Sequence, residues 1–421
     1  SRAPCGQGGM AFRFGMPSEE TVLFRRPRHI LPVIALSQFA GVSLWFSSNA
    51  VLPDLQANWH LPAEALGDLT SAVQFGFIAG TLVFAFTAIA DRISPRKIFF
   101  ACACLGAAAN GAAVLLDQAM LALLALRFAT GFFLAGIYPV GMKIASGWYD
   151  KDLGRALGYL VGALVGGTAL PHMIRGLGQS LPWQEVTLAV SVFAACGGLL
   201  MLLTVPDGPF LRPGAAFDPK ALLTVFRSPD FRGSALGYFG HMWELYAFWA
   251  FVPAVLAGYA ALHGLMLDIS LWTAAIIAMS VLSCVVGGVL SPRFGSAPVA
   301  AVQLTASGLC CLASPVLFFA PPEIFLPFLL FWGLMVAGDS PQFSALNARF
   351  APPALVGSAL TIANCVGFSI SIVSIQLLNR TFDDLGAAWV LILLAPGPAL
   401  GLLALRRLLR REAVAATISA R

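Results

Sequence analysis

The chain has 421 residues, of which 58% are hydrophobic and 11% are charged. Soluble globular domains contain roughly 45 to 50% apolar and 25% charged residues, so a water-soluble fold is excluded. The net charge of +5 forms no basic stripe outside the short breaks between apolar segments, which argues against nucleic-acid binding.

Apolar segments of membrane-spanning length recur along the chain. A spanning helix needs about 20 mostly apolar residues, and we predict twelve of them. They fall at 30–52, 68–90, 97–116, 119–145, 154–176, 184–204, 233–257, 269–290, 297–319, 324–347, 354–378 and 386–406.

Three segments without such a run separate or flank the predicted spans. Residues 1–29 are expected to be a disordered cytoplasmic leader, in which Met10 or Met16 could be the true start. Residues 205–232 form the predicted linker between two sets of six spans, and 407–421 form a cytoplasmic tail.

Lys and Arg are distributed unevenly between the two ends of the predicted spans. With the N-terminus in the cytoplasm, 22 of the 25 Lys and Arg lie in cytoplasmic segments, only Arg175 and Arg380 lie outside, and Arg127 lies within a span. Since Lys and Arg of short loops remain in the cytoplasm, both termini are predicted to be cytoplasmic, in the cell (inner or plasma) membrane.

The two sets of spans resemble each other at an offset near 200 residues. Residues 87–94 align with 288–295 at a shift of 201, and Ala135, Gly136 and Pro139 align with Ala337, Gly338 and Pro341 at 202. In the first helices of the two sets, Phe39 and Pro53 align with Phe239 and Pro253 at a shift of 200. Internal repeats are common in transporters. The prediction is therefore an all-α membrane protein of two pseudo-symmetric six-helix bundles, 30–204 and 233–406.

The loop after the second span carries a charged motif, Asp91-Arg92 followed by Arg96-Lys97. Together with Arg127 and Gly131 of the fourth span, this motif resembles the major facilitator superfamily. The resemblance covers residues 30–406. It implies a transporter in which the four loop residues form a conformational latch. Asp91 would cap the following helix or pair with an Arg of a neighbouring cytoplasmic loop. The other interpretation of the four residues is charge that only sets topology.

We single out four ionisable residues inside predicted spans, where a charge costs about 2.5 to 3.5 kcal/mol on insertion scales. Glu244 lies near the middle of the seventh span and is the first candidate for a proton site. His241 lies three residues earlier on the same face, so the two side chains could share a cavity and a proton. The other interpretation of the pair is a hydrogen bond that fixes this helix to a neighbour.

The other two ionisable residues have different candidate roles. The resemblance associates Arg127 with energy coupling or an anionic substrate, whereas its structural interpretation is a buried charge that fixes a helix. Asp339, in the tenth span, is either a site residue or the partner of Arg349 or another loop Arg in a gate.

The first span carries Gln38, Trp45 and Asn49 on one predicted helical stripe. The resemblance implies that spans 1, 4, 7 and 10 line a central cavity, so this stripe and Tyr138 are candidate substrate contacts. Aromatic residues at such positions also favour packing or interfacial contacts.

No pattern for catalysis, a cofactor or a metal is found. Seven of the eight Cys lie inside apolar segments, without disulfide or zinc spacing, and no nucleophile with a base appears. We therefore predict a protein that is not an enzyme and has no cofactor.

The preferred function is secondary active transport of a small polar or anionic solute, proton-coupled, by alternating access, in a monomer. Its partners are then the solute, protons and lipid. The alternative is a proton-driven exporter of drugs or metabolites, although the fifth span lacks the Gly-Pro pair of the family's antiporters. A non-transporting sensor of the same fold would be expected to append a soluble domain, for which the 28-residue linker leaves no room.

Overall fold

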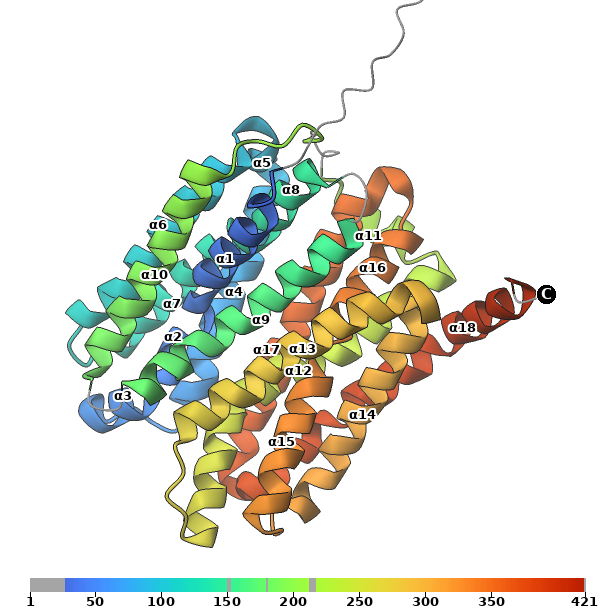
Figure 1. Cartoon of the computed structure of the whole chain (residues 1–421). Coiled ribbons are helices and arrows are strands. Elements are labelled where there is room, and N and C mark those ends of the chain that lie inside the picture. Colours follow the sequence, from blue (N-terminus) through green and yellow to red (C-terminus); the bar gives the residue numbers. More distant parts are fainter. Residues whose placement is uncertain (1–26, 150–152, 179–180, 212–216, 420–421) are drawn as a thin grey trace, which may run out of the picture.

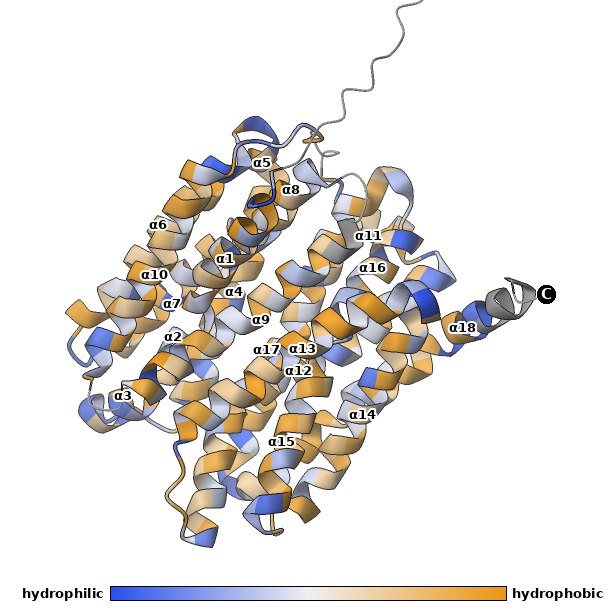
Figure 2. Cartoon of the chain, in the orientation of Figure 1, coloured by the Kyte–Doolittle hydropathy of each residue, from blue (hydrophilic) through white to orange (hydrophobic). Residues whose placement is uncertain are grey.

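The computed structural model describes residues 27–149, 153–178, 181–211 and 217–419. The regular elements of these residues are all helices (Figure 1), and 11 helical stretches are long and apolar enough to cross a bilayer. Hydrophobic residues cover the lengths of the helices, whereas hydrophilic residues gather at their ends (Figure 2). The predicted leader, apart from residues 27–29, and both candidate start methionines lie outside the described residues.

The helices before residue 205 are called the first set. They are α1 (Ile30–Val42), η1 (Ser43–Phe46), α2 (Ser47–Ala50), α3 (Leu52–Trp59), α4 (Ala65–Thr87), α5 (Ile89–Arg92), α6 (Pro95–Gly111), η2 (Ala112–Leu115), α7 (Met120–Leu134), α8 (Tyr138–Trp148), α9 (Leu153–Leu177) and α10 (Trp183–Thr204).

The helices after residue 220 are called the second set. They are α11 (Ala221–Val225), α12 (Pro229–His263), α13 (Ile269–Phe294), α14 (Ser296–Leu317), α15 (Pro322–Val336), α16 (Ser340–Phe350), η3 (Pro353–Leu355), α17 (Val356–Trp389), η4 (Val390–Leu394) and α18 (Pro396–Ser419). Figure 1 shows α5 and α8 at one end of the helices and α3 at the other; these are called the α5 end and the α3 end.

The fourth and tenth predicted spans are each broken at the same place. The helix α7 has 15 residues and α8 has 11, and the same lengths recur in α15 and α16. Both breaks contain an Ala-Gly pair, Ala135-Gly136 and Ala337-Gly338. A Cβ at Gly136 would lie 2.2 Å from Cys102 Sγ, and one at Gly338 would lie 2.3 Å from Gln303 Nε2. The small residues therefore let each break approach a neighbouring helix.

Helices extend beyond the apolar segments from which the spans were predicted. Helix α12 begins at Pro229, inside the predicted linker, and runs to His263, and α18 continues through the predicted tail to Ser419. A hydropathy window stops where charged residues begin, but the backbone hydrogen bonds of a helix do not depend on apolar side chains. The helix that contains the seventh predicted span, 233–257, is therefore longer than that span at both ends. The helix that contains the end of the twelfth predicted span continues into the predicted tail, 407–421.

The last apolar stretch, Pro353–Glu412, is 60 residues long. Helix α17 contains Gly386, whose φ of 71° and ψ of 173° are not helical. The chain turns there, before η4 and α18. Glycine is suited to this point because it adopts positive φ without the steric cost of a Cβ.

Glycines allow neighbouring helices to pack backbone against backbone. A Cβ at Gly131 of α7 would lie 1.9 Å from Val73 O of α4, and a Cβ at Gly76 of α4 would lie 1.9 Å from Phe128 O of α7. In the second set, a Cβ at Gly333 would lie 2.1 Å from Ile276 O of α13. Such close approach is a principal source of helix association in membranes.

Candidate functional site

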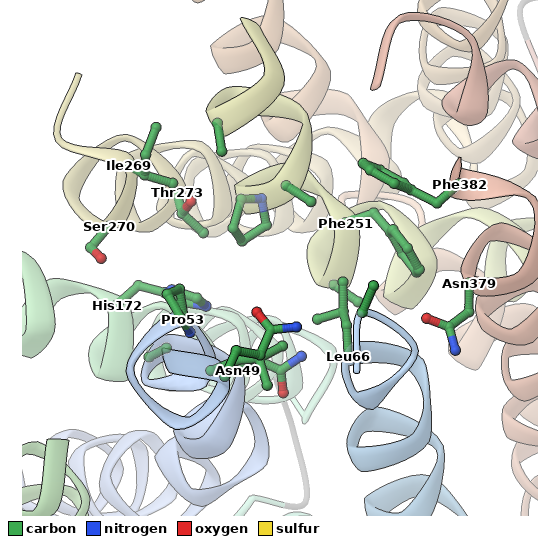
Figure 3. Close-up of a pocket in the computed structure, with 18 of the residues that line it drawn as sticks. Asn49, Pro53, Leu66, His172, Phe251, Ile269, Ser270, Thr273, Asn379 and Phe382 are labelled. Carbon is green, nitrogen blue, oxygen red and sulfur yellow. The ribbon is translucent and has the colours of Figure 1, made fainter. Parts of the chain in front are cut away.

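A cavity of about 500 Å³ lies between the two sets of helices at the α3 end. Helices α2, α3, α4 and α9 of the first set line it, together with α12, α13 and α17 of the second (Figure 3). Pro53 and Pro253, which the sequence comparison aligns at a shift of 200, both line this cavity. Its volume is within the range of small-molecule sites.

The amide side chains of the cavity are bonded to protein groups. Asn49 donates to Thr70 Oγ1 over 2.8 Å, and Asn379 donates to Glu64 O over 2.9 Å while accepting from the Gly67 amide over 3.2 Å. In contrast, His172 Nε2 and Thr273 Oγ1 have no hydrogen-bond partner among the described residues, although their residues are only 2% and 0% exposed. These two lining groups therefore have unused hydrogen-bonding capacity although they are buried.

An aromatic cluster, defined as Trp45, Phe77, Tyr246 and Phe368, lies beyond the cavity toward the middle of the protein. The ring of Trp45 stacks on those of Tyr246 and Phe368 at centroid distances of 5.5 and 5.4 Å, and Phe77 contacts Trp45 at 4.9 Å. Since α12 lines the 500 Å³ cavity with Ala250 and later residues, the cluster is one turn further toward the α5 end.

A second cavity, of about 30 Å³, lies on the other side of the aromatic cluster. Its lining includes Tyr138, Tyr238, Trp249, Ser340 and Asn364. This volume corresponds to about one water molecule. The cavity at the α3 end is thus much larger than the one on the other side of the cluster.

Hydrogen bonds join α4 to α17 along one flank of this interface. Ser371 donates to Gln74 Oε1 over 2.8 Å, and Gln376 donates to Ser71 Oγ over 2.9 Å and to Asp68 Oδ1 over 3.2 Å. With Asn379 these groups form a polar seam between helices that are about 300 residues apart in the chain. On the other flank, α9 packs on α13, where a Cβ at Gly176 would lie 2.5 Å from Leu271 Cγ.

Arg127 lies inside the first set and lines neither interface cavity. Its guanidinium donates to Asn110 Oδ1 over 2.8 Å, to Leu44 O over 3.0 Å and to Trp45 O over 2.6 Å. Both carbonyls belong to η1, the 3-10 segment of the first span. The contacts correspond to the structural interpretation of Arg127, a buried charge that fixes a helix.

Glu244 also points away from the interface, into the second set. Its carboxylate accepts hydrogen bonds from Ser307 over 2.9 Å, from Trp332 over 2.7 Å and from the Cys311 thiol over 3.4 Å. The donors come from α14 and α15. The side chain is 1% exposed, and no described Lys, Arg or His pairs with it.

His241 and Glu244 have different partners, contrary to the expectation of a shared proton. His241 Nδ1 lies 2.8 Å from Asp339 Oδ1, and both side chains are 1% exposed. Asp339 is the N-cap residue of α16, at the break between α15 and α16. The predicted partner of Asp339, Arg349, pairs instead with Glu412 over 3.3 Å. The break between α15 and α16 thus places Asp339 beside His241 of α12.

The predicted stripe of the first span is divided among three surroundings. Gln38 lies over α8, 3.5 Å from Tyr138 O, Trp45 belongs to the aromatic cluster, and Asn49 lines the 500 Å³ cavity. The 3-10 segment η1 lies between them, and its three residues per turn shift the side-chain directions from those of a regular α-helix. The stripe prediction was therefore wrong in assuming one uninterrupted helix.

The loop after the second span contacts α8, α10 and the segment that follows α10 at the α5 end. Asp91 of α5 forms an ion pair with Lys143 of α8. Arg96 donates to Leu202 O over 3.3 Å, and Ser94 donates to Asp207 over 2.8 Å. Arg92 and Lys97 are exposed.

The ion pair between Asp91 and Lys143 should be weak but measurable. Both side chains are about one-fifth exposed, and such pairs contribute roughly 0.2 to 1 kcal/mol. We expect Asp91→Lys and Lys143→Asp each to lower the thermal unfolding midpoint in detergent, and the double swap to recover most of the loss. Strictly additive losses in this double-mutant cycle would show that the pair has no coupling energy.

Comparison with known proteins assigns this architecture to a protein family. The family model described as Major Facilitator Superfamily matches residues 34–375. The chain belongs to this superfamily. No curated protein sequence matches it significantly.

Solved structures of superfamily transporters have the same fold. A human organic anion transporter, MFSD10 (TETRAN), superposes with a TM-score of 0.68 at 15% identity, covering 90% of this chain and 100% of that one. The proton:xylose symporter XylE gives 0.69 at 14%, covering 89% and 94%, and a mutant of the nucleoside transporter NupG gives 0.69 at 13%, covering 89% and 98%. At these identities the likeness establishes the fold of a Major Facilitator Superfamily transporter and nothing finer.

Sequence reasoning missed His172, Thr273 and the polar seam of this superfamily member. His172 satisfies the criterion that selected Glu244, an ionisable residue inside an apolar span, and could have been found by applying it to the fifth span. Thr273 and the seam residues carry no such signal, because a hydroxyl or amide inside a span is ordinary until its neighbours are known.

Proposed function

We propose that the protein is a secondary transporter that moves a small polar or anionic solute across the cell membrane by alternating access. The observation that carries this proposal is the cavity at the α3 end, which lies between the two sets of helices, with the aromatic cluster beyond it. If the two sets rock about this site, the α3 end closes and a path opens beyond the cluster. The seam between α4 and α17 and the packing of α9 on α13 are the contacts that such a movement would rearrange.

The proposed arrangement has twelve spans, six in each set, with both termini in the cytoplasm. Gly386 divides the 60-residue apolar stretch into its last two spans. The excess of Lys and Arg in segments at the α5 end supports placing that end in the cytoplasm, so the α3 end would face outward.

A panel of radiolabelled sugars, nucleosides and organic anions, tested for counterflow in proteoliposomes, tests the transport proposal. Counterflow measures exchange and does not depend on an ion gradient. We expect one class to exchange and the exchange to be blocked by excess unlabelled solute. Failure of every class to exchange above protein-free liposomes would count against transport of such solutes.

Glu244 is the proposed site of proton coupling. A carboxylate buried without a cationic partner is costly to keep charged, and here three donors from two helices hold it. Loss and gain of a proton would change its hydrogen bonds to Ser307 and Trp332, and with them the packing of α14 and α15 on α12. Coupling by this route would act on the second set from within and not through direct contact with the solute.

The variant Glu244→Gln is expected to abolish solute accumulation driven by a proton gradient and to retain counterflow. Glutamine keeps the size of the side chain, but its amide does not bind a proton at the pH values of a transport experiment. The measurement is uptake into proteoliposomes with and without an imposed pH gradient, with Glu323→Gln, an exposed carboxylate, as the matched control. If Glu244→Gln accumulated solute as wild type does, Glu244 would not be the coupling site. Coupling would then depend on the His241–Asp339 pair, or transport would not be coupled to protons.

A further inference from the structure

The 500 Å³ cavity has a lining that distinguishes charged from uncharged ligands. Among the described residues no Lys or Arg lines it, and its single carboxylate, Asp383, has an exposed side chain. Arg175, one turn after His172 on α9, is held by Asp54 over 2.9 Å. Neither an anion nor a cation in the buried part of the cavity would therefore find a countercharge.

Two buried groups of the lining remain free to bind a ligand. His172 Nε2 and Thr273 Oγ1 have no hydrogen-bond partner in the described part of the chain, whereas Asn49 and Asn379 are engaged with the protein. Leaving a buried polar group without a partner costs stability, and a ligand that bonds to both groups would recover this cost. Figure 3 shows His172 and Thr273 on the same side of the cavity, across from Phe382 and Asn379.

The chemistry of these two groups indicates what the ligand carries. A hydroxyl both donates and accepts, and a neutral imidazole does so through its two nitrogens. An imidazole that is buried without a carboxylate partner is most stable in its uncharged form. The rings of Phe251 and Phe382 and the two prolines provide apolar surface around these polar groups.

We propose that the cavity binds an uncharged solute bearing hydrogen-bond donors and acceptors, and that His172 and Thr273 determine this specificity. The physiological meaning of this inference rests on the proposed transport function. The inference narrows the class of solute from polar or anionic to uncharged. The amide donors that could otherwise have attracted an anion are already bonded within the protein.

The test measures the charge preference of the cavity without knowing the solute. Thr273→Cys is labelled with three methanethiosulfonates of similar size, the neutral hydroxyethyl, the anionic sulfonatoethyl and the cationic trimethylammonioethyl reagents. Rates are followed by intact-protein mass and divided by those of a free thiol in solution. Wild type gives the background of the native cysteines, and Thr187→Cys, buried on α10 away from the cavity, is the matched control.

The neutral reagent is expected to label Thr273→Cys, and each charged reagent to react at least about tenfold more slowly. That ratio corresponds to only about 1.4 kcal/mol, less than the cost of burying an unpaired charge. In the same background, His172→Glu is expected to make the cationic reagent at least about tenfold faster relative to the anionic one, because a carboxylate then shares the cavity.

Three results would overturn the inference. The sulfonate could react as fast as the neutral reagent, the cationic reagent could do so, or no reagent could label position 273 faster than position 187. If Thr273→Cys does not fold, Ser270→Cys, one turn earlier in the same lining, gives the same reading. Labelling needs no transport, so an absence of solute flux with the expected labelling would contradict only the proposed function.

Discussion

Replacement of Gly131 by alanine is expected to remove most of the folded protein. The new Cβ would lie 1.9 Å from Val73 O and 2.7 Å from Val73 C, and a backbone carbonyl cannot swing aside as a flexible side chain can. Helices α4 and α7 would have to separate, which also breaks the reciprocal contact of Gly76 with Phe128 O. We expect a loss of about 3 kcal/mol or more, at the upper end of overpacking effects.

The measurement is the yield of monodisperse protein in size-exclusion chromatography, together with its thermal unfolding midpoint. Gly158→Ala is the matched control, because no heavy atom lies within 4 Å of a Cβ there. Gly333→Ala, at the aligned position of the second set, should behave like Gly131→Ala. Equal yields and midpoints for Gly131→Ala and Gly158→Ala would contradict the close packing of α4 on α7.

Arg127→Leu is expected to destabilise the first set of helices by roughly 1 to 3 kcal/mol, the cost of leaving buried hydrogen-bond acceptors without a donor. The substitution leaves Leu44 O, Trp45 O and Asn110 Oδ1 without their donor in a region that water does not reach. Removing a buried charge returns part of its desolvation cost, so the loss is smaller than three separate hydrogen bonds would indicate.

Arg127→Lys should fall between wild type and Arg127→Leu. An ammonium retains the charge but lacks the planar set of donors that reaches three acceptors. The midpoint of thermal unfolding measures this order of stability. Arg92→Leu is the control, because Arg92 is exposed. If Arg127→Lys or Arg127→Leu unfolded at the wild-type temperature, the hydrogen bonds to η1 would have no structural role.

Hydropathy predicted where the helices lie because crossing a bilayer imposes an apolar composition of fixed length. It could not predict the ends of α12 and α18, where charged residues continue a helix beyond the apolar region. The repeat at a shift of 202 correctly aligned the residues around the breaks at Ala135-Gly136 and Ala337-Gly338, since small residues and proline mark both.

The partners of the ionisable residues could not be predicted from their spacing. Glu244 and His241 are three residues apart, yet Glu244 binds α14 and α15 and His241 lies beside Asp339. The choice depends on the rotation of α12 against helices 60 to 100 residues away, which no local pattern encodes. For the same reason Arg127 was placed correctly inside a span, but its acceptors in η1 could be found only from the structure.

The break in the first span has a consequence for the biogenesis of the protein. Its aligned counterpart, α12, is an unbroken helix of 35 residues, and position 329, aligned with Arg127 at a shift of 202, is Leu. The first span therefore needs a side chain from the fourth to bond carbonyls that an intact helix would bond itself. Since lipid offers carbonyls no donors, Leu44 O and Trp45 O have their Arg127 donor inside the bilayer only after the fourth span has packed against the first.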